Sequence, residues 1–245
     1  MVPTTERYVR TIVEQSTELA RQARGALDKA VAHCPGWTVA DLVAHLVEVH
    51  WFWATVVDQQ LAAAPTSARP ARPDRDHLID RFLVGAQCLA DVLARADQSA
   101  AVYTWAPSRH DVAFVTRHQV QEVAVHHWDV ANAVGQRAGL DPALAADSVE
   151  EFLTFSLSSD LDPADPPRPP LDGALSLVAA DVDRAWTVRD SQPGTVLVVD
   201  GVHAAATLTA PAFELLLWLY GRVELDAPAP ADQLGRRLRA LSFTD

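Results

Sequence analysis

The chain has 245 residues, of which 49% are hydrophobic and 21% charged, and it carries a formal net charge of −12 at pH 7. This length and composition are typical of a globular protein with one large domain or two modest ones. An acidic surface repels phosphates, so nucleic acid and anionic lipid are excluded as expected partners.

The N-terminal residues, the apolar runs and the cysteines indicate where the protein is located and which chemistry it can use. The first residues, MVPTTERYVR, are charged and hold no apolar core, and no later run reaches the ~18 apolar residues of a membrane span. We therefore expect a cytoplasmic protein, monomeric or homodimeric. Cys34 and Cys88 show no paired spacing, so neither a disulfide framework nor a thiolate zinc site is expected. Neither cysteine is predicted to be a nucleophile, and a metal would use histidine and carboxylate ligands.

Apolar spacings near three and four predict five helices in the first two thirds of the chain. Thr38 and Asp41 resemble a capping box at the start of the second helix, and Gly135 follows the fourth. The expected helices cover Arg7 to Leu27, Thr38 to Leu61, Leu78 to Leu93, Val112 to Val134 and Ala143 to Leu157.

The composition and the apolar pattern of the sequence change after residue 160. Five prolines between Asp160 and Gly173 indicate a linker. The runs LSLVAADVD, RAWTVRD, GTVLVVDG and AAATLTA favour short strands, and TAPAFELLLWLYGR favours a helix that ends at Gly221. The fold class is thus mainly α, with a helical bundle over residues 1–160, a linker over 161–173 and a small α+β domain over 174–245.

The stretch QEVAVHHWDV carries the chemistry. Glu122 and His126 are four residues apart, so on a helix they lie one turn above each other on the same face. A carboxylate and an imidazole suit zinc, and His45, on the stripe of the second helix expected to turn inward, is the best third ligand. Asp129 is placed to orient His126, and His127 is expected to point elsewhere.

Other interpretations of these residues stay open on spacing alone. His118, Glu122 and His126 could form a solvated polar stripe instead of a metal site. A single histidine on an apolar face is more often a hydrogen-bonded core residue. Glu48 could reach the site from the second helix, whereas His50 is about 140° around that helix from His45 and is not expected to share its ion.

The segments WTVADLVAHL and RHQVQEVAVHHWDVANAVG together resemble the mycothiol-dependent maleylpyruvate isomerase family, within the DinB-like metal-binding four-helix bundles. The resemblance covers most of the chain. It implies a DinB-like bundle, a divalent metal, usually zinc, on His45, Glu122 and His126, and mycothiol as the thiol.

The same resemblance implies a role for Arg222, which follows Gly221 at the end of the late helix. It would act as a catalytic and cofactor-binding residue, although an arginine at this place also suits a helix dipole and its free carbonyls. The aromatic run VHWFWATVV departs from the isomerase and puts maleylpyruvate itself in doubt as the substrate. We expect Trp51 to contribute to the cofactor and substrate pocket.

These features predict a mycothiol-dependent S-transferase or isomerase that acts on a small, carboxylate-bearing electrophile through a metal-bound thiolate. Two alternatives remain. One is a metal-dependent hydrolase with water at the open position and His118 or Glu48 as base. The other is a binding or sensor protein that the metal only stabilises.

Overall fold

The computed structural model describes residues 3–106, 108–157, 170–192, 195–199, 204 and 206–242. Their contacts divide the chain into two compact units that meet in the sequence between Gly139 and Leu140. The expected boundary at residue 160 differs from this one. The fifth helix groups with the C-terminal unit because it packs against a helix of that unit. Most of the expected linker, up to residue 169, lies outside the described residues.

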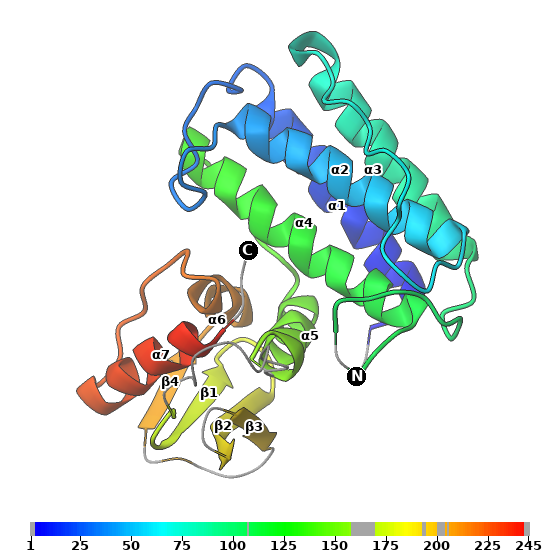
Figure 1. Ribbon diagram of the computed structural model, residues 1–245. Coiled ribbons are helices and arrows are strands. Elements are labelled where there is room, and N and C mark those ends of the chain that lie inside the picture. The colour runs from blue at the N-terminus through cyan, green and yellow to red at the C-terminus, as the bar shows by residue number, and fades with distance from the viewer. Residues whose placement is uncertain are drawn as a thin grey trace. The chain divides into compact units, whose positions relative to one another are not determined.

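The N-terminal unit is the predicted four-helix bundle (Figure 1). Helix α1 packs against both α3 and α4, and α2 packs against α3, whereas α2 and α4 share few contacts. The sparse seam between α2 and α4 is where the candidate site lies. The four helices are α1 (Thr5–Ala23), α2 (Val39–Asp58), α3 (Leu78–Arg95), which follows a 3₁₀ turn at Arg75–His77, and α4 (Val112–Val134).

Local signals account for the ends of these helices. Thr38 and Asp41 form the predicted capping box at the start of α2, and their hydrogen bonds lower the pKa of Asp41 to about 2. Gly135 ends α4 in the left-handed conformation, with φ of 70°. Helix α1 ends at Ala23 instead of Leu27 because Gly25 turns the chain with φ of 77°.

The C-terminal unit is α+β, as predicted. It begins with α5 (Pro142–Glu151), which continues as a π-helical turn at Phe152–Ser156. The four β-prone runs form one sheet in the order β3-β2-β1-β4, in which β1 pairs antiparallel with β2 and parallel with β4. The strands are β1 (Ala174–Ala179), β2 (Arg184–Gln192), β3 (Thr195–Val199) and β4 (Ala206–Ala210).

Two further helices pack on β1 and β4 of this sheet. Helix α6 (Ala212–Leu219) was predicted. Helix α7 (Ala229–Leu241) was not, because its buried positions are few and stand among charged residues. Within the described part of the chain, no helix combines the length and the apolar character needed to cross a membrane.

We expect Gly235→Ala to destabilise the C-terminal unit. A Cβ at Gly235 of α7 would lie 2.5 Å from Cζ2 of the buried Trp218 in α6. Overpacking of this kind costs about 1–3 kcal/mol, more than the ~1 kcal/mol that alanine adds to helix propensity. Gly85→Ala in α3 is the matched control, because its Cβ would meet His50 only at 3.4 Å. Urea unfolding followed by circular dichroism compares them, and equal stability of the two variants would contradict the prediction.

We also expect His50 to make the bundle sensitive to acid. Burial between α2 and α3 lowers the pKa of His50 to about 4, below its ordinary value of 6.5. The unfolded chain therefore binds the proton more tightly, so stability is lost as the pH falls from about 6.5 towards 4. His50→Phe keeps a ring against Phe82 but cannot titrate. Over this interval the free energy of unfolding of the variant should fall less than that of the wild type, and the difference should reach up to about 3 kcal/mol. Parallel pH profiles of the two proteins would contradict the assignment.

Candidate metal centre

The direction of His45 follows from the packing of α2. Leu42, Val43 and Leu46 are fully buried in the bundle core, which sets the rotation of the helix. His45 is then carried to the side of α2 that faces α4, with 36% of its side chain exposed. The indole of Trp37 packs beside its ring at a centroid distance of 5.2 Å.

Helix α4 presents Glu122 and His126 to the same seam. Their positions four residues apart place the two side chains one turn from each other on one face, as predicted. Both are largely covered: the side chain of Glu122 is 21% exposed and that of His126 is 12% exposed. A solvated polar stripe would be far more open than this, so the exposure favours a site.

The three residues converge across the seam. Nε2 of His45 lies 3.3 Å and Nε2 of His126 lies 3.5 Å from Oε1 of Glu122. One ligand-type atom from each residue falls within 4.8 Å of the others. The rings of His45 and His126 meet edge to face, with centroids 5.4 Å apart. Two imidazoles and one carboxylate at this spacing can hold a divalent ion.

Asp129 orients the ring of His126 through Nδ1. Its buried carboxylate lies 3.1 Å from Nδ1 of His126, as the sequence predicted. Burial alone would lower the pKa of His126, but hydrogen bonds to Asp129 and Glu122 outweigh it and raise that pKa to about 9. Burial would likewise raise the pKa of Glu122, yet hydrogen bonds with His126 and His45 hold it well below its ordinary value. The cluster therefore surrounds one protonated imidazole with two carboxylates, and a metal ion at Nε2 would replace its proton.

A second group of ligand-type residues shares His126. Cys34, in the loop before α2, lies with its Sγ 3.9 Å from Oδ2 of Asp129, and these two residues and His126 also fall within 4.8 Å of one another. The two groups would use different nitrogens of one ring. Coordination through Nε2 keeps the bond from Nδ1 to Asp129, an arrangement that histidine ligands usually have, so we favour the set with His45 and Glu122.

Cys34 is the residue that sequence reasoning missed at this site. The sequence predicts for it neither a thiolate metal site nor a nucleophilic role. No spacing in the sequence signals it, because it approaches Asp129 across 95 positions of the chain.

Other residues that the sequence raised lie outside this group. Glu48 pairs with Arg69 at 3.4 Å, and His127 turns to Gln15 of α1, with 2.6 Å between Nδ1 and Oε1. His118 lies among aromatic rings, stacked on Phe114 at a centroid distance of 5.8 Å.

Trp51 and Arg222 are not part of the group. Trp51 lines a pocket between α2 and α3, because it leaves α2 on another side from His45. Arg222 belongs to the C-terminal unit. Its backbone N–H closes the end of α6 on the carbonyl of Leu217, with Gly221 in the left-handed conformation. Its guanidinium is buried over the ring of Tyr220 and donates to the carbonyl of that residue at 2.9 Å.

A known protein family matches the bundle. The family model of the mycothiol maleylpyruvate isomerase N-terminal domain matches residues 9–131. No curated protein sequence matches the chain.

Two solved structures share its fold. A crystal structure of a mycothiol-dependent maleylpyruvate isomerase is 13% identical, with a TM-score of 0.61 over 92% of this chain and 96% of that chain. A histidine-to-alanine variant of a mycothiol-dependent maleylpyruvate isomerase is 12% identical, with a TM-score of 0.62 over the same shares. Because the family model spans half of its residues, the chain belongs to the mycothiol maleylpyruvate isomerase family and is, as its two motifs predicted, an enzyme of the mycothiol-dependent transferase or isomerase class.

Proposed function

We propose that the protein transfers or isomerises a small, carboxylate-bearing electrophile with mycothiol, using a divalent metal, zinc in the first instance, on His45, Glu122 and His126. The observation that supports this most is the convergence of these side chains from two helices that otherwise share few contacts. The use of mycothiol as the thiol follows from membership of the family. The identity of the electrophile and that of the metal are part of this proposal.

The donor set fits a metal of this kind. Two imidazole nitrogens and a carboxylate are three protein ligands, which is the number typical of catalytic zinc sites with a fourth position open. When bound, the metal would lower the pKa of a thiol at that position, so that the thiol is a thiolate at neutral pH.

The residues of the chain have separate tasks in this proposal. Asp129 accepts from Nδ1 of His126 and so keeps Nε2 turned towards Glu122. Glu122 contributes the negative charge that a dication requires. The side chain of His45 is partly exposed, so a thiol can approach the three ligands from that side.

Arg222 is proposed to pair with the carboxylate of the electrophile. A guanidinium matches a carboxylate with two parallel N–H groups, and it would also stabilise negative charge that develops on the substrate. The contact of Trp51 with the cofactor stays a prediction. A cytoplasmic location is also part of the proposal, because free thiols persist in a reducing compartment.

Metal content tests the ligand assignment. We expect about one equivalent of zinc in the purified full-length protein. His45→Ala, Glu122→Gln and His126→Ala should each lower metal affinity by a large factor, because each leaves only two ligands. Asp129→Asn should weaken it by about 10–100-fold, since the orientation of His126 is lost. Elemental analysis and competition with a chromophoric chelator measure both effects.

His118→Ala is the matched control for the metal experiment. It removes an imidazole from the same face of α4, one turn before Glu122, and should leave the affinity unchanged. If the ligand variants keep their metal, or if no preparation of the wild type binds zinc, the assignment is wrong. Loss of metal in a Cys34→Ser variant, with His45→Ala unaffected, would instead support the group formed by Cys34, His126 and Asp129.

Thiol dependence tests the chemistry. We expect turnover of electrophilic carboxylic acids only when mycothiol is added, and with cobalt in place of zinc we expect a thiolate-to-metal absorption band when mycothiol binds. Arg222→Gln should raise KM for carboxylate substrates more than for their amides, because it removes the cation. Circular dichroism and the urea unfolding midpoint should match those of the wild type, which checks that the variant is folded.

The outcomes separate the alternatives. Turnover without thiol would favour a metal hydrolase. Bound zinc without any thiol-dependent band or turnover would favour a protein that the metal only stabilises.

A further inference from the structure

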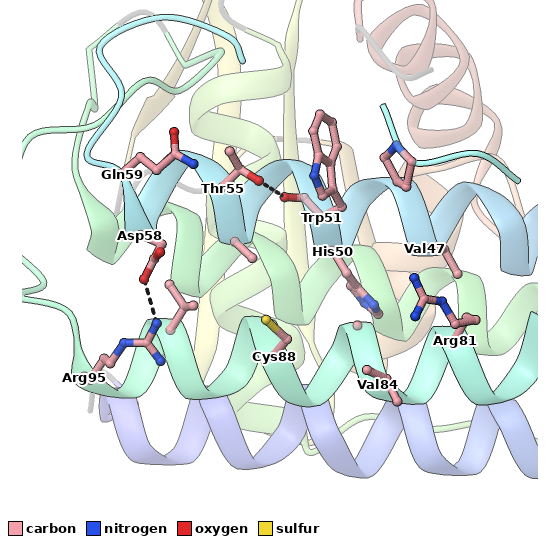
Figure 2. Close-up of a pocket in the computed structure, with 14 residues that line it drawn as sticks. Val47, His50, Trp51, Thr55, Asp58, Gln59, Arg81, Val84, Cys88 and Arg95 are labelled. Atoms are coloured by element: carbon pink, nitrogen blue, oxygen red, sulfur yellow. Dashed lines mark hydrogen bonds and ion pairs between the residues drawn. The ribbon is translucent and has the colours of Figure 1, made fainter. Parts of the chain in front are cut away.

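A second concave feature lies in the bundle, on a different side of α2 from the metal centre. It is a pocket of about 330 Å³ between α2 and α3, at the lower end of the range of ~300–1,000 Å³ that small-molecule sites occupy. Figure 2 shows its lining, with Trp51 and His50 from α2 and Val84, Cys88 and Arg81 from α3. His50 is five residues after His45, about 140° around the helix.

Most of the lining is apolar. Val47 and Ala54 of α2, Val84 and Val92 of α3 and Pro70 of the connecting segment contribute to it. Val84 is one of two large hydrophobic residues that are exposed among the described residues, with 62% of its surface open. An apolar rim of this kind favours a ligand with an apolar body.

His50 supplies an unsatisfied polar atom in this pocket. It is 2% exposed, and its Nδ1 has no hydrogen-bond partner in the described part of the chain. Burial keeps the ring neutral at pH 7 by lowering its pKa to about 4. A neutral imidazole has one donor and one acceptor nitrogen, and a hydroxyl group can bond to either, so a hydroxyl would satisfy Nδ1.

The space in front of this nitrogen is kept open by Gly85. A Cβ built on Gly85 would lie 3.4 Å from Nδ1 of His50. Glycine within a helix costs about 1 kcal/mol of stability relative to alanine, and here it leaves room for an atom beside the imidazole.

Arg81 supplies an unpaired cation. Its exposed guanidinium has no ion-pair or hydrogen-bond partner among the described residues, whereas Arg95, further along α3, pairs with Asp58 at 2.6 Å. The two arginines and one aspartate leave the lining with a net positive charge on a protein of net charge −12. In Figure 2 the guanidinium of Arg81 and the ring of His50 extend into the same space from facing helices.

We propose that this pocket binds a small monocarboxylic acid that carries a hydroxyl group on an apolar body, with Arg81 pairing with the carboxylate and Nδ1 of His50 hydrogen-bonded to the hydroxyl. Each part of the ligand matches one observation: the apolar lining, the lone cation and the buried nitrogen without a hydrogen-bond partner. The inference does not depend on the proposed thiol chemistry, because none of the proposed metal ligands lines the pocket.

Isothermal titration calorimetry with the full-length protein tests the proposal. The probes are the three hydroxybenzoates, with benzoate lacking the hydroxyl and phenol lacking the carboxylate. We expect at least one hydroxybenzoate to bind with a Kd below about 1 mM. It should bind more tightly than benzoate or phenol, because it alone satisfies both groups.

Two variants assign the contacts. Arg81→Gln should weaken the best hydroxybenzoate and benzoate by about tenfold or more and leave phenol unchanged, because the exposed side chain contributes only charge. His50→Phe should remove the advantage of the hydroxybenzoate over benzoate. Arg10→Gln is the control, since it removes another exposed arginine, which lies in α1 and pairs with Glu14 outside the pocket.

His45→Ala distinguishes this site from the metal centre and should leave hydroxybenzoate binding unchanged. The proposal is overturned if no hydroxybenzoate binds below the stated limit. It is also overturned if Arg81→Gln has no larger effect than Arg10→Gln, or if binding is lost in His45→Ala and kept in Arg81→Gln. Because Arg81 is exposed, its variant gives this answer even where His50→Phe fails to fold.

Discussion

The contact of Glu122 with two imidazoles is the interaction on which the rest of the site depends. A carboxylate that is only 21% exposed loses much of its hydration and needs compensation from neighbouring groups. His126 on the same helix and His45 on α2 supply it, at 3.5 and 3.3 Å. The seam between α2 and α4 is thereby closed by polar contacts where apolar packing is sparse.

Hydrogen bonds hold the cluster together without a metal. Asp129 and Glu122 raise the pKa of His126 to about 9, so the imidazole is protonated at neutral pH and offsets part of the charge of the two carboxylates. A divalent ion, as proposed, would replace the proton on Nε2 and keep Asp129 bonded to Nδ1.

Helix α2 contributes to two different parts of the bundle, because residues a few positions apart lie on different sides of the helix. His45 faces α4 and a charged partner, while His50 faces α3 and is buried against Phe82. The pKa of His50 falls because burial dominates there, whereas hydrogen bonds dominate at His126. Two histidines of one bundle thus differ in charge at neutral pH: His50 is neutral in an apolar pocket and His126 is protonated between two carboxylates.

The sequence by itself determined the parts that depend on neighbours in the chain. Helical spacing, the capping box of Thr38 and Asp41, and Gly135 are local signals, and they placed the bundle helices to within a few residues. The spacing of Glu122, His126 and Asp129 on one helix was local as well. The apolar stripe of the second helix favoured His45 over His50 as the third ligand, and the family resemblance supported the same residue.

Tertiary structure decided the features that depend on residues far apart in the chain. Whether His45 meets Glu122 across 77 positions depends on the rotation of α2, which the packing of its apolar residues sets. The same rotation turned Trp51 towards α3, and the loop before α2 brought Cys34 to Asp129. Helix α5 joined the C-terminal unit because α6 covers it. Periodicity tells which face of a helix is buried, but only packing tells which partner buries it.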